Sequence, residues 1–313
     1  MPFLFSNWIL VAIFAYFLHA GNVIMDKILL KEHHISNPFS YAFYGGIWGG
    51  LACILIPFAS FFVPSVSVLL LAFLSGGASI AALMFFYSAM KEGEPSRIST
   101  LLGGLSPVFV FFLSFLFFGT FIEGFDLVAF FILILGGVIV TYEPHQHSGR
   151  RRSTRIALVV LAAFCFALTY VSARAVFNST PFLTGFIWTR FGACVASLLL
   201  LLHPSLRKNI FSWSPRRSSH TSGLFVTNKL AAAGGFFLLS YSISLIPFAS
   251  PEKVSIVNAM QGIEYVFVFL LALFLSVSYP AVISEHIDAK TILLKITAVL
   301  CVAGGLILLA FGS

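Results

Sequence analysis

The sequence predicts an all-α integral membrane protein with ten transmembrane helices, arranged as two inverted five-helix repeats. The chain of 313 residues is 59% hydrophobic and only 9% charged, whereas a soluble domain carries roughly 25% charged residues. The charged residues are clustered, which leaves apolar stretches of about 18 residues or more, long enough to cross a hydrocarbon core as helices. The second half of the chain also repeats, weakly, the order of short motifs found in the first half.

Four pairs of segments carry this repeat. The clearest pair begins at Pro107 and at Tyr265, where the chain reads PVFVFFLSFLF and YVFVFLLALFL. The other pairs begin at Asn37 and Thr180, at Pro95 and Pro251, and at Ile134 and Val302. Five helices per copy is an odd number, so the second copy enters the membrane from the opposite side and the repeats are expected to be inverted. A duplicated membrane unit of this kind is typical of secondary transporters.

The breaks between apolar runs place the elements. Proline stands at or near several helix starts, where its missing N–H costs little. Helices are expected near residues 7–29, 38–63, 66–90, 95–119, 124–142, 155–177, 182–202, 224–247, 251–280 and 290–311. The first repeat is then 1–143, the second is 155–313, and a basic loop at 144–154 connects them. The segments are too long, and too uniformly apolar, for the strands of a β-barrel.

Lys and Arg lie mostly on one side of this arrangement. The loops after helices 1, 3, 5, 7 and 9, with their flanks, hold Lys27, Lys31, Lys91, Arg97, Arg150, Arg151, Arg152, Arg155, Arg207, Lys208, Arg216, Arg217, Lys229, Lys290 and Lys295. The opposite loops and helix ends hold only Lys253 and Arg174. The positive-inside rule makes the basic side cytoplasmic, so both termini are expected to face outward.

The longest loop, from His203 to Ser222, is either a solvated connector or a surface that touches anionic lipid headgroups.

Several function classes are disfavoured by the sequence. The net charge of +7 is explained by topology signals, so no nucleic-acid partner is expected. The four cysteines lie in apolar segments without a Cys-x-x-Cys pair, and no P-loop, His-Glu-x-x-His or Gly-x-Ser-x-Gly motif occurs. The pair His145 and His147 lies beside four arginines that would repel a cation. We therefore expect no metal, no cofactor and no enzymatic activity.

Two ionisable residues inside predicted helices are the sharpest candidates for a site, because a charge at the bilayer centre costs about 2.5–3.5 kcal/mol on insertion scales. Glu264 is predicted near the midplane, and Arg190 lies at a similar depth from the same face. Arg190 is a candidate to hold a substrate carboxylate, and Glu264 is a candidate to take up a coupling proton. The alternatives are a structural Arg–Glu pair, or an Arg190 side chain that snorkels to the interface.

Further polar side chains stand out on apolar helices. Asn258 and Gln261 precede Glu264 at three-residue spacing, so the three form a stripe that either lines a pathway or bonds to neighbouring helices. His19 and Asn22 form a similar pair on the first helix. Matching positions of the two repeats hold Tyr87 and Tyr241, which line a cavity or lie at the membrane interface. The predicted substrate-binding residues are thus His19, Asn22, Tyr87, Arg190, Tyr241, Asn258, Gln261 and Glu264.

Several motifs give the chain a family resemblance. Gly21 and Asn22 are followed by Lys27 on the first helix, and Arg190 follows Pro181 in the second repeat. The end of the third helix, Tyr87-Ser88-Ala89-Met90, is followed by Ser106-Pro107 in the fourth. Paired glycines close each repeat at Gly136-Gly137 and Gly304-Gly305. In these features the chain resembles the drug/metabolite transporter superfamily of the EamA type, with two EamA-like domains. It departs from the pattern at Ile47, at Gly119-Thr120 and at Ile263-Glu264. Members of this family also often have both termini in the cytoplasm, which is the opposite of the orientation that the Lys and Arg residues indicate.

The resemblance implies a multi-pass protein of a bacterial-type cytoplasmic membrane, here called the plasma membrane. It implies secondary transport of small organic solutes or metabolites, outward and by alternating access. The expected partners are a small-molecule substrate, the lipid bilayer and a coupling proton or ion, with a monomer or homodimer as the assembly. A flippase for a lipid-linked substrate is the first alternative. A membrane-embedded lipid-modifying enzyme is the second.

Overall fold

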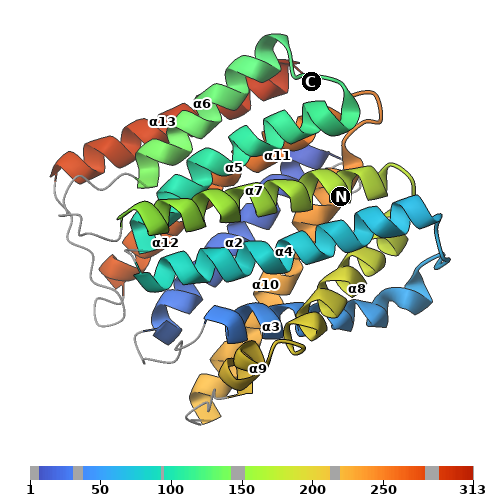
Figure 1. The fold of residues 1–313 in the computed structure, drawn as a ribbon. Coiled ribbons are helices and arrows are strands. Elements are labelled where there is room, and N and C mark those ends of the chain that lie inside the picture. The colour runs from blue at the N-terminus through green and yellow to red at the C-terminus, as the bar shows by residue number, and fades with distance from the viewer. Residues whose placement is uncertain are drawn as a thin grey trace.

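The computed structural model describes residues 7–30, 38–92, 95–141, 152–211, 219–278 and 289–312, and these are helices joined by short connections. The first half contains α2 (Trp8–Leu30), α3 (Pro38–Gly49), the 3₁₀ helix η1 (Gly50–Phe58), α4 (Val66–Glu92), α5 (Pro95–Phe118) and α6 (Gly124–Thr141). The second half contains α7 (Arg152–Phe177), α8 (Phe182–Leu200), α9 (Pro204–Phe211), α10 (Ser219–Leu245), η2 (Pro251–Lys253), α11 (Val254–Ala259), α12 (Gln261–Ser278) and α13 (Ala289–Gly312). Most of the helices run lengthwise through one bundle (Figure 1).

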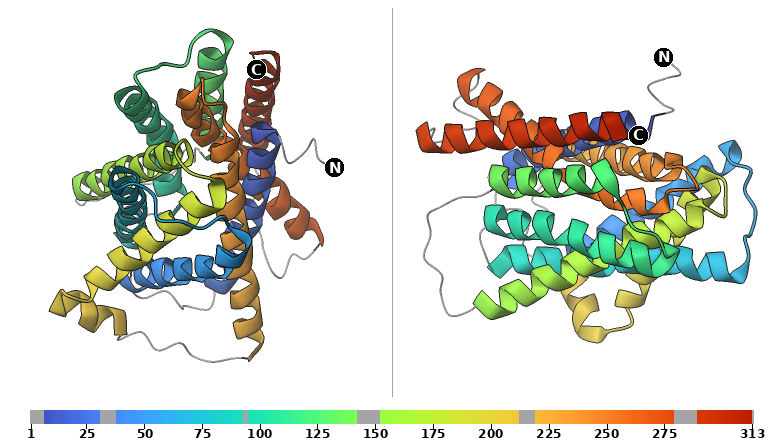
Figure 2. Two further views of the ribbon diagram at one scale, coloured as in Figure 1. Left: turned by 90° about the vertical axis from the view of Figure 1, so that its right-hand side faces the viewer. Right: turned by 90° about the horizontal axis from the view of Figure 1, so that it is seen from above.

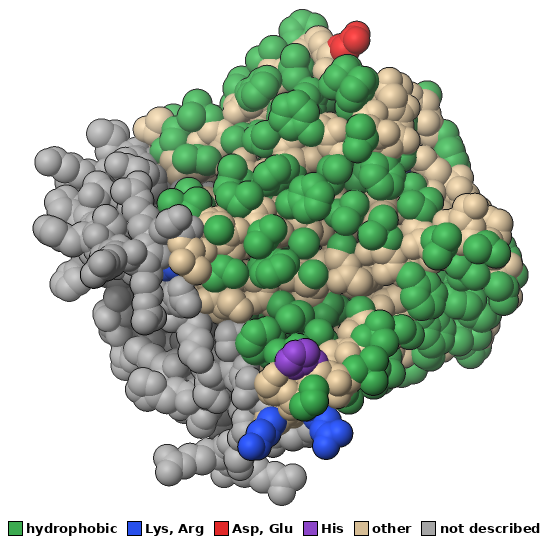
Figure 3. All heavy atoms as spheres, viewed as in Figure 1, with side chains coloured by type: hydrophobic (Ala, Val, Ile, Leu, Met, Phe, Trp, Pro, Cys, Tyr) green, Lys and Arg blue, Asp and Glu red, His purple; other side chains and the backbone are tan. Residues whose placement is uncertain are grey.

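Six of the described helical stretches are long and apolar enough to cross a membrane: Trp8–Met25, Val66–Met90, Leu101–Phe118, Thr154–Phe177, Phe182–Leu200 and Pro251–Leu275. Four shorter apolar stretches accompany them: Ala42–Phe58, Gly124–Ile139, Leu230–Leu245 and Ile296–Leu309. The face of the bundle seen in Figure 3 is covered largely by hydrophobic side chains, and Lys and Arg of the described residues gather at its edge beside α9. An apolar face with a basic edge suits a protein embedded in lipid.

The two halves of the chain are interleaved. The most extensive contacts join α4 to α7 and to α8, α7 also to α5, α2 to α10 and to α12, and α6 to α13. Every one of these pairs takes one helix from each half, and the two turned views in Figure 2 show the same intermixing. The start of α2 and the end of α13 lie at one end of the bundle (Figures 1 and 2). Neither half therefore forms its core alone.

Glycine allows two contacts between helices of different halves to be close. A Cβ placed on Gly192 of α8 would lie 2.7 Å from Phe73 Cα and 2.8 Å from the Ala72 carbonyl oxygen of α4. A Cβ on Gly262 would lie 3.1 Å from Gly137 Cα. Small residues of this kind let helix backbones approach each other directly, which is the usual basis of packing between membrane helices.

Three elements differ from the sequence-based expectation. The helix expected at 38–63 is two pieces, α3 and η1, and it ends at Phe58; Pro57, which has no N–H to donate, stands in the last turn of η1. The helix expected at 251–280 is η2, α11 and α12, interrupted at Met260. The loop expected from His203 onward contains α9, whose exposed Arg207 and Lys208 contrast with the fully buried Ile210.

Hydrogen bonds from the Arg174 side chain connect α7 to the end of α10. Its side chain is only 1% exposed, and its guanidinium donates hydrogen bonds to the carbonyl oxygens of Ile243 at 3.0 Å, Ser244 at 3.3 Å, Ile246 at 2.7 Å and Pro247 at 3.0 Å. The last carbonyls of a helix have no partner within it, and a cation near them is favoured by the helix dipole. Arg174 therefore caps α10, rather than acting as the topology signal that its place near a helix end suggested.

Two further polar contacts, an ion pair and a hydrogen bond, join segments near the start of α11 and α6. Lys253 Nζ lies 2.9 Å from Asp126 Oδ2 at the start of α6. The Thr120 hydroxyl donates to Glu252 Oε2 at 2.7 Å. These contacts join the segment that enters α11 to the α5–α6 connection.

Candidate functional site

A narrow cavity lies where α2, α7, α10 and α11 meet. It is too narrow to hold a sphere of the size of a water molecule, and it is lined by Tyr16, Tyr170, Leu239, Ile243, Val254, Val257 and Asn258. Pockets for small molecules usually measure roughly 300–1,000 Å³. The bundle is therefore nearly closed around this point in the conformation described.

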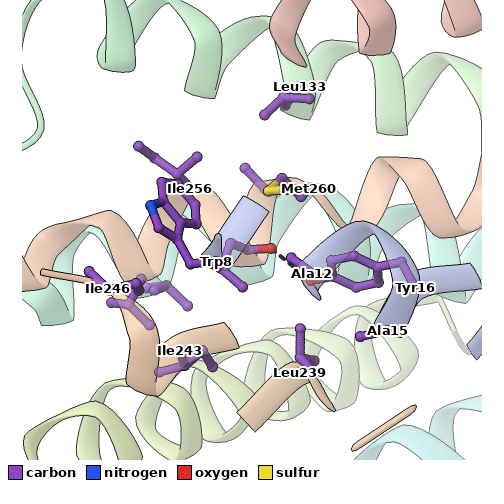
Figure 4. Packing of buried hydrophobic residues seen from close by; sticks show 14 of the residues in the cluster. Trp8, Ala12, Ala15, Tyr16, Leu133, Leu239, Ile243, Ile246, Ile256 and Met260 are labelled. Carbon is purple, nitrogen blue, oxygen red and sulfur yellow. Dashed lines mark hydrogen bonds between the residues drawn. The ribbon is translucent and has the colours of Figure 1, made fainter. Parts of the chain in front are cut away.

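Apolar packing surrounds the cavity. Trp8, Ala12 and Tyr16 of α2 pack with Ile256 and Met260 on one side and with Leu239, Ile243 and Ile246 on the other (Figure 4). In so apolar a setting, a polar group without a partner costs free energy. The few polar groups near the cavity are therefore the ones that need an explanation.

The polar groups gather at the interruption between α11 and α12. The Tyr16 hydroxyl donates to the Val257 carbonyl oxygen at 2.7 Å. The Met260 N–H bonds to the Ile256 carbonyl at 2.9 Å, and the Ile263 N–H bonds to the Met260 carbonyl at 2.9 Å, one residue short of helical spacing. Broken helices of this kind are tolerated inside a membrane only where protein or a cavity receives the freed backbone groups.

Asn258 is the most deeply buried of the predicted site residues. Its side chain is 4% exposed and lines the cavity. Its Oδ1 atom is buried and accepts no hydrogen bond. An unsatisfied buried amide oxygen costs about 1–3 kcal/mol, so Asn258 is the polar residue of this cavity that most needs an explanation.

Glu264 lies in the first turn of α12, within electrostatic range of Tyr16, Tyr170 and Tyr265. Tyr16 and Tyr170 also line the cavity, so the carboxylate belongs to the same polar cluster. It is half-buried. We name this group, Tyr16, Tyr170, Asn258, Glu264 and Tyr265, the central polar cluster.

Arg190 is placed beside aromatic rings rather than beside a carboxylate. The centre of its guanidinium lies 4.1 Å from the centroid of the Phe236 ring and 5.6 Å from that of Phe186. Such cation–π contacts hold a cation away from water. Arg190 and Glu264 are both described, and no ion pair joins them in this conformation. Arg190 does lie within electrostatic range of Tyr170, which places it at the margin of the central polar cluster.

The remaining predicted residues are spread around this cluster. His19 lies one turn beyond Tyr16, with ring centroids 6.4 Å apart, and its Nε2 is buried without a hydrogen-bond partner. Asn22 follows on α2, and Gln261 begins α12. Tyr241 packs against Phe182 at 5.1 Å between ring centroids. Tyr87, near the end of α4, does not line the cavity, and neither does Tyr241.

Two polar residues that line the cavity, Tyr16 and Tyr170, were not predicted from the sequence. The signal was present, because the same number of positions separates Tyr16 from Tyr170 as separates Tyr87 from Tyr241. A tyrosine in an apolar helix is common, however, and only its tertiary neighbours distinguish a cavity residue from a packing one. Among the described residues, no group of three or more His, Cys, Asp or Glu side chains is arranged to hold a metal ion. The loop containing His145 and His147 lies outside the described residues.

The chain is similar to a known protein family and to a solved structure. Residues 6–142 match the model of the EamA-like transporter family. A crystal structure, described only as that of a protein, has the same fold, with a TM-score of 0.64 and 15% sequence identity over 96% of this chain and 94% of that chain. No curated protein matches the chain.

The match to the EamA-like family model confirms the resemblance seen in the sequence over residues 6–142, which lie in the first of the two expected repeats. Together with the apolar helices, it makes the chain an integral, multi-pass membrane protein. The family consists of membrane transporters of small solutes. The α2–α6 segment, which contributes Tyr16 to the cavity, falls wholly within the matched residues.

Proposed function

We propose that this EamA-like protein exports small organic solutes by alternating access between two inverted five-helix repeats, residues 1–143 and 155–313. The four shorter apolar stretches would cross the membrane together with the six long ones, making ten. The pairing of helices supports this architecture. Contacts of α2 with α10 and α12 correspond to contacts of α7 with α4 and α5 when each helix is exchanged for its counterpart in the other half. The basic loop at 144–154 would join the repeats.

The observation that carries the proposal is the central polar cluster, which is enclosed where the two halves meet. Tyr16 comes from the first half, whereas Tyr170, Asn258 and Glu264 come from the second. Transporters built from repeats bind their substrates at such an interface, near the bilayer midplane, often beside a discontinuous helix. The cavity is smaller than a solute, which is consistent with an occluded conformation that opens to each side in turn.

Individual residues take roles in this proposal. Glu264 provides the charge that a coupling proton or ion neutralises, because a lone carboxylate within the bilayer is costly. Asn258 and the two cavity tyrosines provide hydrogen-bonding groups for the solute. Arg190, held over Phe236, becomes available to an anionic group of the solute when the cavity widens. His19, Asn22 and Gln261 extend the polar lining, and Tyr87 and Tyr241 occupy the corresponding places farther out. We place the protein in a bacterial-type cytoplasmic membrane, as a monomer or homodimer.

Transport assays on purified protein test this function. Proteoliposomes would be loaded with a mixture of amino acids, nucleosides and small amines, and the solutes released over time would be identified by mass spectrometry against protein-free liposomes. We expect at least one solute to leave faster through the protein, with its mass unchanged. Conversion of a solute or a lipid would indicate an enzyme. Movement of labelled lipid-linked sugars without release of any soluble compound would indicate a flippase.

A further inference from the structure

We propose that a seam of polar contacts between the two halves of the chain is the gate that closes the cavity toward the end of the bundle where α2 begins. The seam joins α5 and α6 of the first half to η2 and α11 of the second half, which pack against them (Figure 1). This role rests on the proposed transport function and deepens it, because it names the contacts that must separate before a solute passes. We call these residues the polar seam: Ser114, Thr120, Asp126, Glu252, Lys253 and Ser255.

The rim of the polar seam is an ion pair and a hydrogen bond. Lys253 Nζ lies 2.9 Å from Asp126 Oδ2, and the two side chains are 16% and 11% exposed. The Thr120 hydroxyl donates to Glu252 Oε2 at 2.7 Å. The other carboxylate oxygen, Asp126 Oδ1, is buried without a hydrogen-bond partner. Because polar groups can exchange each other for water, whereas apolar side chains lose buried area when they part, the halves separate here at a low free-energy cost.

The inner part of the seam lies next to the cavity. The hydroxyl oxygens of Ser114 on α5 and Ser255 on α11 lie 3.2 Å apart, and both side chains are buried. Ser255 directly follows Val254, and Val254 and Asn258 both line the cavity. The helix that carries the inner seam is thus a wall of the cavity, and its displacement from α5 would uncover the lining.

The seam lies at the end of the bundle that is expected to face outward. The Ser242 hydroxyl, near the end of α10, donates to the Trp8 carbonyl oxygen at 2.7 Å. The start of α2 and the connection from α10 to η2 therefore share this end. The positive-inside rule places it opposite the basic loops. A gate here controls the outward opening of the cavity.

Breaks in helical structure bound both sides of the seam. Gly119 and Gly124 flank the connection that carries Thr120, with φ angles of +71° and +59°, and nothing lies within 4 Å of a Cβ added to either. Glycine adopts this left-handed backbone without strain. On the other side, α11 is a six-residue helix with η2 before it and the interruption at Met260 after it. Each side can therefore move as a short unit about its ends, as hinged segments do.

Accessibility of the cavity tests the gate without a known solute. Asn258→Cys would place a thiol in the cavity lining, and its reaction with a water-soluble maleimide would be followed by mass spectrometry. We expect slow labelling in this background, and faster labelling when Lys253→Gln or Asp126→Asn removes one charge of the ion pair. Arg207→Gln is the control, because Arg207 is exposed on α9, which packs on α3. The same proteins without Asn258→Cys would correct for labelling of the four native cysteines.

A reversible cross-link tests whether the seam must part during transport. Because the two serine hydroxyls lie 3.2 Å apart, Ser114→Cys/Ser255→Cys brings two thiols within reach of a disulfide. In proteoliposomes, diamide would oxidise the two thiols to the disulfide, and dithiothreitol would reduce it again. We expect the cross-link to abolish solute release and its reduction to restore release. Each single variant lacks the second thiol and should release solute in the presence of diamide.

The outcomes separate the gate from the transport function. The gate would be overturned by undiminished release from the cross-linked protein, or by labelling of Asn258→Cys at one rate with and without the ion pair. Solute release by the wild-type protein would then still support the transport function. Faster labelling in both charge variants, without release of any solute by the wild-type protein, would instead retain a seam that opens and overturn the transport function.

Discussion

Single buried polar residues decide how the helices of this protein are joined. Arg174 is the clearest case, since one guanidinium satisfies carbonyl oxygens from four residues at the end of α10. Sequence reasoning placed this residue near a helix end but could not assign its partners, which lie about 70 positions away along the chain. A charge near the end of an apolar helix is compatible with snorkelling, with topology or with capping, and only tertiary contact distinguishes them.

The capping role of Arg174 predicts a loss of stability on substitution. Arg174→Gln should lower the free energy of unfolding by about 3 kcal/mol, because hydrogen bonds from a charged donor are lost and several carbonyls are left without partners. Melting of purified protein in detergent would measure the change. Arg207→Gln is the control, since Arg207 is exposed on α9, and it should melt like the wild type. Equal effects of the two substitutions would argue against the cap.

The proposed coupling role of Glu264 predicts that one substitution separates gradient-driven accumulation from solute exchange. If it carries the coupling charge, Glu264→Gln should abolish accumulation driven by an ion gradient but retain exchange of solute across the membrane. Both activities would be measured in the same proteoliposomes once a transported solute is known. Glu123→Gln, at an exposed position before α6, should change neither. Retained gradient-driven accumulation in Glu264→Gln would remove the carboxylate from the coupling role.

At the scale of elements, the local sequence determines where the helices form, whereas contacts with neighbouring helices determine where they are interrupted. The apolar runs predicted most helices closely, as for α7 and α8. The break at Met260 was not predicted, because residues 251–278 contain no proline after Pro251 and read as one apolar segment. It is compatible with the fold because the Tyr16 hydroxyl bonds to the Val257 carbonyl and Gly262 packs against Gly137. These partners come from α2 and α6, which sequence periodicity does not place.

From the close packing of α4 on α8 we predict a loss of stability when the contact glycine is enlarged. Gly192→Ala should destabilise the protein by about 1–3 kcal/mol, because the new methyl group would meet the backbone of Ala72 and Phe73 and force the helices apart. Gly21→Ala on α2 is a matched substitution with nothing within 4 Å of the added Cβ. That control should be neutral or slightly stabilising, since alanine favours helix over glycine. Similar melting temperatures for the two variants would contradict close contact between α4 and α8.

At the scale of the whole molecule, the interleaving of the two halves determines both the core and the site. The described ends of the chain lie together at one end of the bundle (Figure 2). The cavity residues come from helices of both halves. A half expressed alone would expose much of the apolar surface that now packs against its counterpart.

The orientation of the molecule is open to a direct test. A reporter active only in the cytoplasm should give no signal when fused to the C-terminus, and should be active when inserted near Ser214, because the basic loops are expected to be cytoplasmic. Comparable expression of the two fusions would be verified by immunoblotting. The opposite pattern of activity would reverse the orientation without affecting the helical fold.

The sequence by itself determined that the protein is a bundle of apolar helices, where most of them begin and end, and which family its first part resembles. These features follow from composition, from breaks at proline and from local motifs, which need no knowledge of distant contacts. It also singled out Asn258 and Glu264, because polar groups are rare in apolar helices. Only the tertiary structure decided that Tyr16 and Tyr170 line the cavity, that Arg190 packs on Phe236 and that Arg174 caps α10. Each of these depends on a partner far away in the chain, and helices that are apolar on all sides do not encode which face meets which neighbour.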